Sequence, residues 1–183
     1  MIKIFSILLI LSNTTFGFSQ TASQYPEWVA TSSSVKFKIK NAGFNVDGVF
    51  SGLISKIQFD GSKSFGNLIE ATIDANTVNT NSGGRDAHLK KPDYFNVSKF
   101  PKISMKATLI TKEKDGTYKG YFKLTIKDKS KDFFIPFLFE EKDGKGTFTA
   151  KFTINRLDFN IGESSMILAD TVIMSIEINV LKK

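Results

Sequence analysis

The chain has 183 residues, with 25 lysines and arginines against 18 aspartates and glutamates, and a formal net charge of +7 at pH 7. It has no cysteine and a single histidine, a poor inventory for zinc, copper or thiol chemistry. Its basic residues are lysines except for Arg85 and Arg156 and they alternate with apolar residues, whereas a nucleic-acid groove clusters its cations and favours arginine. Composition thus predicts no metal, no cofactor and no nucleic-acid partner, and leaves an anionic membrane surface as a weak peripheral attractor.

The first twenty residues have the order of a secretory signal peptide. Lys3 is followed by an apolar run at residues 4–11 and then by small and polar residues up to Gln20. The run is far shorter than the ~20 residues that a membrane-spanning helix needs. We therefore expect residues 1–20 to be a signal peptide, residues 21–183 to form one domain, and the mature protein to be periplasmic or secreted.

From Val35 onward, apolar and polar residues alternate with the two-residue period of half-buried strands. After a strand starting at Val35, further strands are predicted at residues 48–60, 67–75, 102–111, 117–127, 132–140, 147–155 and 171–181. Turn sequences such as KEKDG and EKDGKG separate several of them. Eight antiparallel strands in one small domain must protect their edges, and closure into a barrel does so. The predicted fold is all-β, an eight-stranded antiparallel barrel with a short helical insertion between the third and fourth strands.

The same alternation predicts which side chains face the barrel interior. The candidates are Phe37, Phe50, Ile103, Met105, Leu109, Phe122, Leu124, Phe133, Ile135, Phe137, Phe148, Phe152, Met174 and Ile176. An eight-stranded barrel is wide enough either to be filled by side chains or to hold one small ligand. Periodicity leaves both alternatives open.

The strand at residues 133–139, FFIPFLF, is apolar on both faces. Pro136 has no N–H to donate to a neighbouring strand, so it predicts a sheet edge or a bulge. The outward apolar face also needs cover, for which the segment at residues 82–95 is a candidate.

Residues 82–101, SGGRDAHLKKPDYFNVSKFP, hold the only histidine and one of the two arginines. Gly83 and Gly84 allow a turn into a short helix, which Pro92 ends. A catalytic role for His88 is disfavoured, because Asp86 lies two residues away on the helix and does not face it, and no nucleophile is specified nearby. We expect a structural role, in which Asp86 caps the helix or pairs with Arg85 or Arg156 and so ties the insertion to the barrel rim. An open alternative is that the start of the helix and the Arg85 guanidinium contact an anionic head group.

Arg156, in the sequence INRLDF, stands at a strand end. The expected partners of its guanidinium are Asp158, Asp86 or Asp93.

The series TVNTNSGGRDAHLKKPDYFNVSKFPKISM resembles the signature of the YceI-like family, exported proteins that bind polyisoprenoid lipids. FNVDGVFSGLISKIQFD, YKGYFKLTIKDKSKDFFIPF, INRLDFNIG and LADTVIMSIEI match further family segments in the same order, so the resemblance covers nearly all of residues 34–180. Departures fall in turns and at the barrel mouth: Asp128 and Asn160 stand where the family usually has glycine, and Lys90 and Lys91 replace an arginine-containing pair.

The resemblance implies a lipocalin-like barrel with an apolar tunnel that holds an isoprenoid chain, polyprenyl or quinone-like, for sequestration, transport or storage, with no catalytic residue. The implied tunnel residues are Phe37, Phe50, Ile103, Met105, Leu109, Phe122, Leu124, Phe137, Phe152 and Met174, and the candidate head-group or rim residues are Gly84, Arg85, Asp86, His88, Tyr94 and Arg156. The protein is expected to be a monomer or a homodimer. The alternative function is a packed, ligand-free barrel with an envelope stress or protein-interaction role.

Overall fold

The computed structural model describes residues 24–63 and 65–183, so the predicted signal peptide lies outside the described residues. The strands are β1 (Glu27–Asn41), β2 (Phe44–Phe50), β3 (Ile54–Gln58), β4 (Leu68–Asp74), β5 (Lys102–Lys112), β6 (Tyr118–Ile126), β7 (Lys129–Lys142), β8 (Lys145–Asn155) and β9 (Thr171–Lys182). The helical elements are η1 (Ala75–Thr77), α1 (Gly83–Leu89) and η2 (Arg156–Phe159). Within the described residues, no helix has the length and apolar character needed to cross a membrane.

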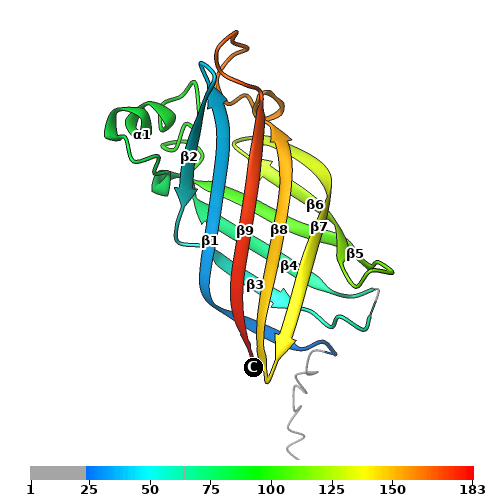
Figure 1. Ribbon diagram of the computed structural model, residues 1–183. Coiled ribbons are helices and arrows are strands. Elements are labelled where there is room, and N and C mark those ends of the chain that lie inside the picture. The colour runs from blue at the N-terminus through cyan, green and yellow to red at the C-terminus, as the bar shows by residue number, and fades with distance from the viewer. Residues whose placement is uncertain (1–23, 64) are drawn as a thin grey trace, which may run out of the picture.

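The strands form a closed antiparallel barrel, because β1 pairs with β9 as well as with its neighbours at the start of the chain (Figure 1). β2 and β3 share one edge of β1: β2 pairs with its second half, and β3 pairs with Glu27 and Trp28. The predicted strand at residues 48–60 is therefore two strands, separated where Gly52 adopts a positive φ of 70°. β2 and β3 together occupy one of the eight strand positions around the barrel, which confirms the predicted eight-stranded antiparallel barrel.

The helical insertion between β4 and β5 lies beside β2, on the edge that faces away from β1 (Figure 1). Val49 and Asn79 form an isolated antiparallel bridge there, with N···O distances of 2.9 and 3.0 Å. The Thr77 hydroxyl accepts a hydrogen bond from the Ser51 amide at 3.1 Å. The insertion thus continues the barrel wall where β2 parts from β3.

Two clusters of buried side chains divide the interior along the barrel. The cluster at the end of the barrel where the C-terminus lies (Figure 1) is called the packed end below. It consists of Trp28, Ile57, Phe59, Ile69, Ala107, Ile110, Tyr118, Phe122, Ile135, Phe137, Phe148, Ile178 and Val180. The other, called the cavity end, consists of Val35, Phe50, Ile73, Ala75, Val78, Phe95, Val97, Ile103, Leu124, Ile126, Ile154, Phe159 and Ile161.

Aromatic rings fill the packed end. The Phe59 ring is fully buried and lies edge-on to Tyr118, Phe139 and Phe148, with centroid distances of 5.1, 5.0 and 5.3 Å. The Trp28 indole donates to the Phe59 carbonyl at 2.9 Å, so its polar group is satisfied although the ring is buried. This end of the barrel is closed by its own side chains.

The prediction that Leu109 faces the interior is wrong, because a β-bulge changes the alternation in β5. The register with β6 shifts between Ala107 and Leu109, where the strand carries an extra residue. Beyond the bulge Ile110 is buried, whereas Leu109 is 41% exposed. Leu109 therefore lies on the outer surface.

Pro136 marks the place where β7 parts from β8, as its missing N–H predicted. β7 pairs with β6 from Lys129 to Phe137, but its pairing with β8 begins only at Phe137. η2 lies at this split, where Phe159 stacks on Phe133 with a centroid distance of 6.3 Å. The expected cover of the outer apolar face by residues 82–95 is wrong, since Phe134 stays 62% exposed.

Candidate functional site

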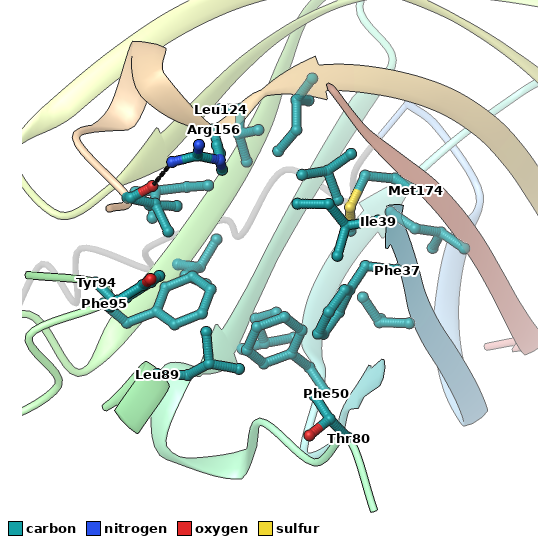
Figure 2. A pocket seen from close by; sticks show the side chains of 18 of the residues that line it. Phe37, Ile39, Phe50, Thr80, Leu89, Tyr94, Phe95, Leu124, Arg156 and Met174 are labelled. Carbon is teal, nitrogen blue, oxygen red and sulfur yellow. Dashed lines mark hydrogen bonds between the residues drawn. The ribbon is translucent and has the colours of Figure 1, made fainter. Parts of the chain in front are cut away.

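A cavity of about 270 Å³ lies in the cavity end of the barrel (Figure 2). Most of the side chains predicted to line an apolar tunnel border it, namely Phe37, Phe50, Ile103, Met105, Leu124, Phe152 and Met174. Phe122 and Phe137 also point inward, but they belong to the packed end and do not border the cavity. The interior is thus filled in one half and hollow in the other.

Further lining residues come from segments outside the regular strands. Leu89, Tyr94 and Phe95 come from the insertion, and Ile161 and Leu168 from the loop between η2 and β9. Strand alternation could not find them, because their side chains reach the interior from helical and loop backbone. Their apolar character was the available signal, and it does not specify a direction.

Gly48 explains how Phe37 can lie across the barrel wall. The two residues are direct cross-strand partners between β1 and β2. A Cβ atom on Gly48 would lie 2.2 Å from Cζ of Phe37, so the ring occupies the space that any side chain at position 48 would need. In this position Phe37 contacts Phe50, whose ring contacts Phe95, with centroid distances of 5.6 Å in both pairs. The three rings join β1, β2 and the insertion into one wall.

Arg156 is a buried charged group at the cavity, and its side chain is only 2% exposed. Its Nη2 atom lies 2.9 Å from Oδ1 of Asp170. The guanidinium also donates to the carbonyl oxygens of Ile161 at 2.9 Å, Ala169 at 3.0 Å and Leu168 at 3.3 Å. Arg156 therefore holds both ends of the loop between η2 and β9.

The partners predicted for Arg156 are wrong. Asp158 pairs with Lys131 instead, at 2.6 Å, on the outside of η2. The actual partner, Asp170, comes near only because the loop returns to the start of β9. That return is a tertiary feature, which spacing along the chain does not reveal.

In the insertion, Asp86 binds Thr80. Its Oδ1 atom accepts from the amide and the hydroxyl of Thr80, at 2.9 and 2.5 Å. The hydroxyl hydrogen bond, more than the nearby Arg85 charge, holds the pKa of this carboxyl below its usual value of 3.8. Arg85 donates to the Thr80 hydroxyl and carbonyl at 2.8 and 2.9 Å. Asp86 thus ties α1 to the chain just before it, and not to Arg156.

The predicted rim residues divide into two groups. Arg85, His88, Tyr94 and Arg156 border the cavity, whereas Gly84 and Asp86 do not. The rings of His88 and Tyr94 touch edge-on, with a centroid distance of 4.8 Å. Most other lining side chains are apolar, so the cavity suits an apolar molecule that has its polar end at the rim. Across residues 24–63 and 65–183, no group of three histidine or carboxylate side chains is placed to hold a metal ion.

The model of the YceI-like domain matches residues 27–180, which include β1 to β8 and nearly all of β9. The chain belongs to the YceI-like family. A UPF0312 protein of Ectopseudomonas mendocina is 28% identical over 179 residues, which cover 92% of this chain and 94% of that protein.

Two solved structures have the same fold as this chain. The structure of BcnA from Burkholderia cenocepacia covers 80% of this chain and 95% of its own, with 22% identity and a TM-score of 0.77. A polyisoprenoid binding domain from Saccharophagus degradans covers 87% of this chain and 99% of its own, with 12% identity and a TM-score of 0.70. At these identities the likeness concerns the fold.

Proposed function

We propose that this YceI-like protein is exported and holds an isoprenoid-type lipid, polyprenyl or quinone-like, in the cavity end of its barrel. The observation that carries the proposal is a cavity of about 270 Å³ walled by Phe37, Phe50, Met174 and their apolar neighbours. The family resemblance and the polyisoprenoid binding domain of the same fold support this ligand class. The lipid is the ligand; the proposal involves no cofactor and no catalytic residue.

Hydrophobic burial gives such a site a sufficient driving force. Each buried methylene contributes ~0.8 kcal/mol, so a few isoprene units contribute on the order of 10 kcal/mol. Association and ordering of the chain cost about 4–15 kcal/mol. Affinity therefore depends on contacts along the apolar chain, and the site discriminates by girth and length more than by head group.

The first test is native mass spectrometry of the protein purified from the envelope of its own host, followed by extraction and identification of any lipid. We expect a stoichiometric added mass that matches a polyprenyl or quinone species. A bare protein that stays bare after incubation with isoprenoid lipids would contradict the proposal and favour the ligand-free interaction role.

A matched pair of variants on β9 connects the bound mass to the cavity. Met174→Glu places a carboxylate on the cavity wall, where an apolar chain cannot solvate it, and we expect the added mass to be lost. The control is Ser175→Glu, because residue 175 lies opposite Lys36 and Lys151 and does not border the cavity. Loss of lipid from both variants, or from neither, would place the lipid elsewhere.

A further inference from the structure

Large apolar side chains are exposed at one end of the barrel, in two adjacent turns. Met166 and Ile167 lie in the loop between η2 and β9, and Phe44 begins β2 just after the β1–β2 turn. Met166 is fully exposed, Phe44 is 77% exposed and Ile167 is 64% exposed. We call these three residues the apolar tip. In Figure 1 both turns are at the top, at the end opposite the C-terminus.

Hydrogen bonds fix the two turns against each other. The Ala42 amide donates to the Ile167 carbonyl at 2.7 Å, and the Ala169 amide donates to the Lys40 carbonyl at 2.9 Å. Within the loop, the Ser165 hydroxyl accepts from the amides of Ile167 and Leu168, at 3.2 and 3.3 Å. The apolar tip is therefore held by its own backbone and by Arg156 at the base of the loop.

The apolar tip is continuous with the cavity wall. Leu168 borders the cavity, and the residue before it, Ile167, points out to solvent. On the other turn, Asn41 and Val46 border the cavity on either side of Phe44. An apolar molecule leaving the cavity past these residues would meet the tip before it met bulk water.

Lysines on the outer face of β1 lead up to the tip. Lys36, Lys38 and Lys40 alternate along the exposed side of the strand, and Lys38 pairs with Asp47 at 3.3 Å. Glu163 is an exposed opposing charge in the loop itself. Apolar side chains at a tip with cations set behind them match the acyl and phosphate layers of an anionic bilayer in that order.

We infer that the apolar tip inserts into the surface of an anionic phospholipid bilayer and so presents the cavity to the membrane. The inference rests on the proposed function, because a water-insoluble cargo has to be exchanged with an apolar phase. The partner is the bilayer surface itself. Docking through the tip lets the cargo pass along Leu168 and Val46 without crossing water.

Tryptophan fluorescence tests whether the apolar tip inserts into the acyl layer of a bilayer. The only tryptophan of the chain, Trp28, is buried in the packed end, so a tryptophan introduced at position 166 can be followed against a constant background. With vesicles of phosphatidylglycerol and phosphatidylcholine that carry brominated acyl chains, Met166→Trp should be quenched. The control is Phe65→Trp, at an exposed position in the loop between β3 and β4 at the other end of the barrel (Figure 1). Equal quenching of both, or of neither, would overturn the inference.

Vesicle sedimentation gives an independent readout. The double variant M166E/I167E should bind phosphatidylglycerol-containing vesicles at least about tenfold more weakly than the unmodified protein, since two apolar side chains are replaced by carboxylates. Phe65→Glu should bind unchanged, and added salt should weaken the binding of the unmodified protein. Undiminished binding by the double variant would overturn the inference, as would no binding by the unmodified protein, which would favour a protein acceptor.

The same double variant separates this inference from the proposed function. Purified from the host envelope, M166E/I167E should still carry its lipid, because neither residue borders the cavity. If the lipid mass persists but the unmodified protein does not bind vesicles, or the double variant binds them undiminished, the docking surface is wrong and the lipid-binding function stands. If the lipid is absent from the unmodified protein as well, the proposed function itself fails.

Discussion

Arg156 shows how a single buried charge organises a loop. Burying a cation is costly unless its hydrogen-bonding groups are satisfied, and here a carboxylate and three carbonyl oxygens surround the guanidinium. The carboxylate of Asp170 is itself 39% exposed, so solvent screens the ion pair. The carbonyl bonds therefore contribute more to the order of the loop than the salt bridge does.

This difference gives a testable prediction for two substitutions. Arg156→Met should lower the free energy of unfolding by about 2–4 kcal/mol, because it leaves the Ile161, Leu168 and Ala169 carbonyls without their donor. Asp170→Asn should cost less than about 1 kcal/mol, since an amide oxygen still accepts from the guanidinium. Urea unfolding followed by circular dichroism measures both. Equal losses would mean that the ion pair, and not the set of carbonyl bonds, holds the loop.

At the scale of elements, β8 crosses from the packed end to the cavity end within a few residues. Phe148 is buried against Phe139, with stacked rings 4.3 Å apart, whereas Phe152 borders the cavity. The two side chains are the same, lie on the same strand and point to the same interior. They differ only in whether the space beside them is filled.

Truncation of each ring should therefore cost different amounts of stability. Phe148→Ala leaves a new cavity in a filled core and should cost about 3–5 kcal/mol. Phe152→Ala only enlarges existing space and should cost clearly less, while it weakens lipid retention. The measurements are denaturant unfolding and the bound lipid mass. Similar losses of stability would show that the cavity end is as tightly packed as the rest.

Sequence patterns predicted the elements well where the backbone is regular. The alternation of Val35, Phe37 and Ile39 with lysines identified the second half of β1, which begins earlier, at Glu27, and Pro136 identified the end of a strand pairing. The errors have local causes. One bulged residue in β5 turned Leu109 outward, and Gly52 divided a strand that the pattern showed as continuous. The alternation is followed residue by residue along the chain. It therefore does not detect an extra residue in a strand when apolar residues still fall at every second position.

For the candidate site, the sequence predicted which side chains face the barrel interior but not how far along the barrel each one lies. Phe122 and Phe137 face the interior as expected, yet they fill it at the packed end, while Phe37 and Met174 border empty space at the other. The height of each residue in the barrel depends on strand tilt and register, which arise from pairings far apart in the sequence. The position of Asp170 beside Arg156 depends on the same kind of long-range return.

For the whole molecule, the division of the interior limits how long a chain can be buried. A volume of about 270 Å³ is near the lower end of the ~300–1,000 Å³ typical of ligand pockets. The rings of Phe59, Tyr118 and Phe148 close the barrel beyond it. A long isoprenoid would therefore be buried over part of its length, with the remainder at the mouth.

A series of isoprenoid alcohols of increasing length tests this limit. Affinity should rise with each of the first few units, because each buried methylene adds ~0.8 kcal/mol. It should then reach a plateau once the cavity is full, since further units stay outside the packed end. Calorimetric titration of the delipidated protein measures the affinity for each alcohol. The variant Phe148→Ala serves as the comparison, because it opens space among the rings that close the packed end. A steady rise over the whole series in the unmodified protein would mean that the packed end rearranges to admit the chain, so that the barrel acts as a tunnel.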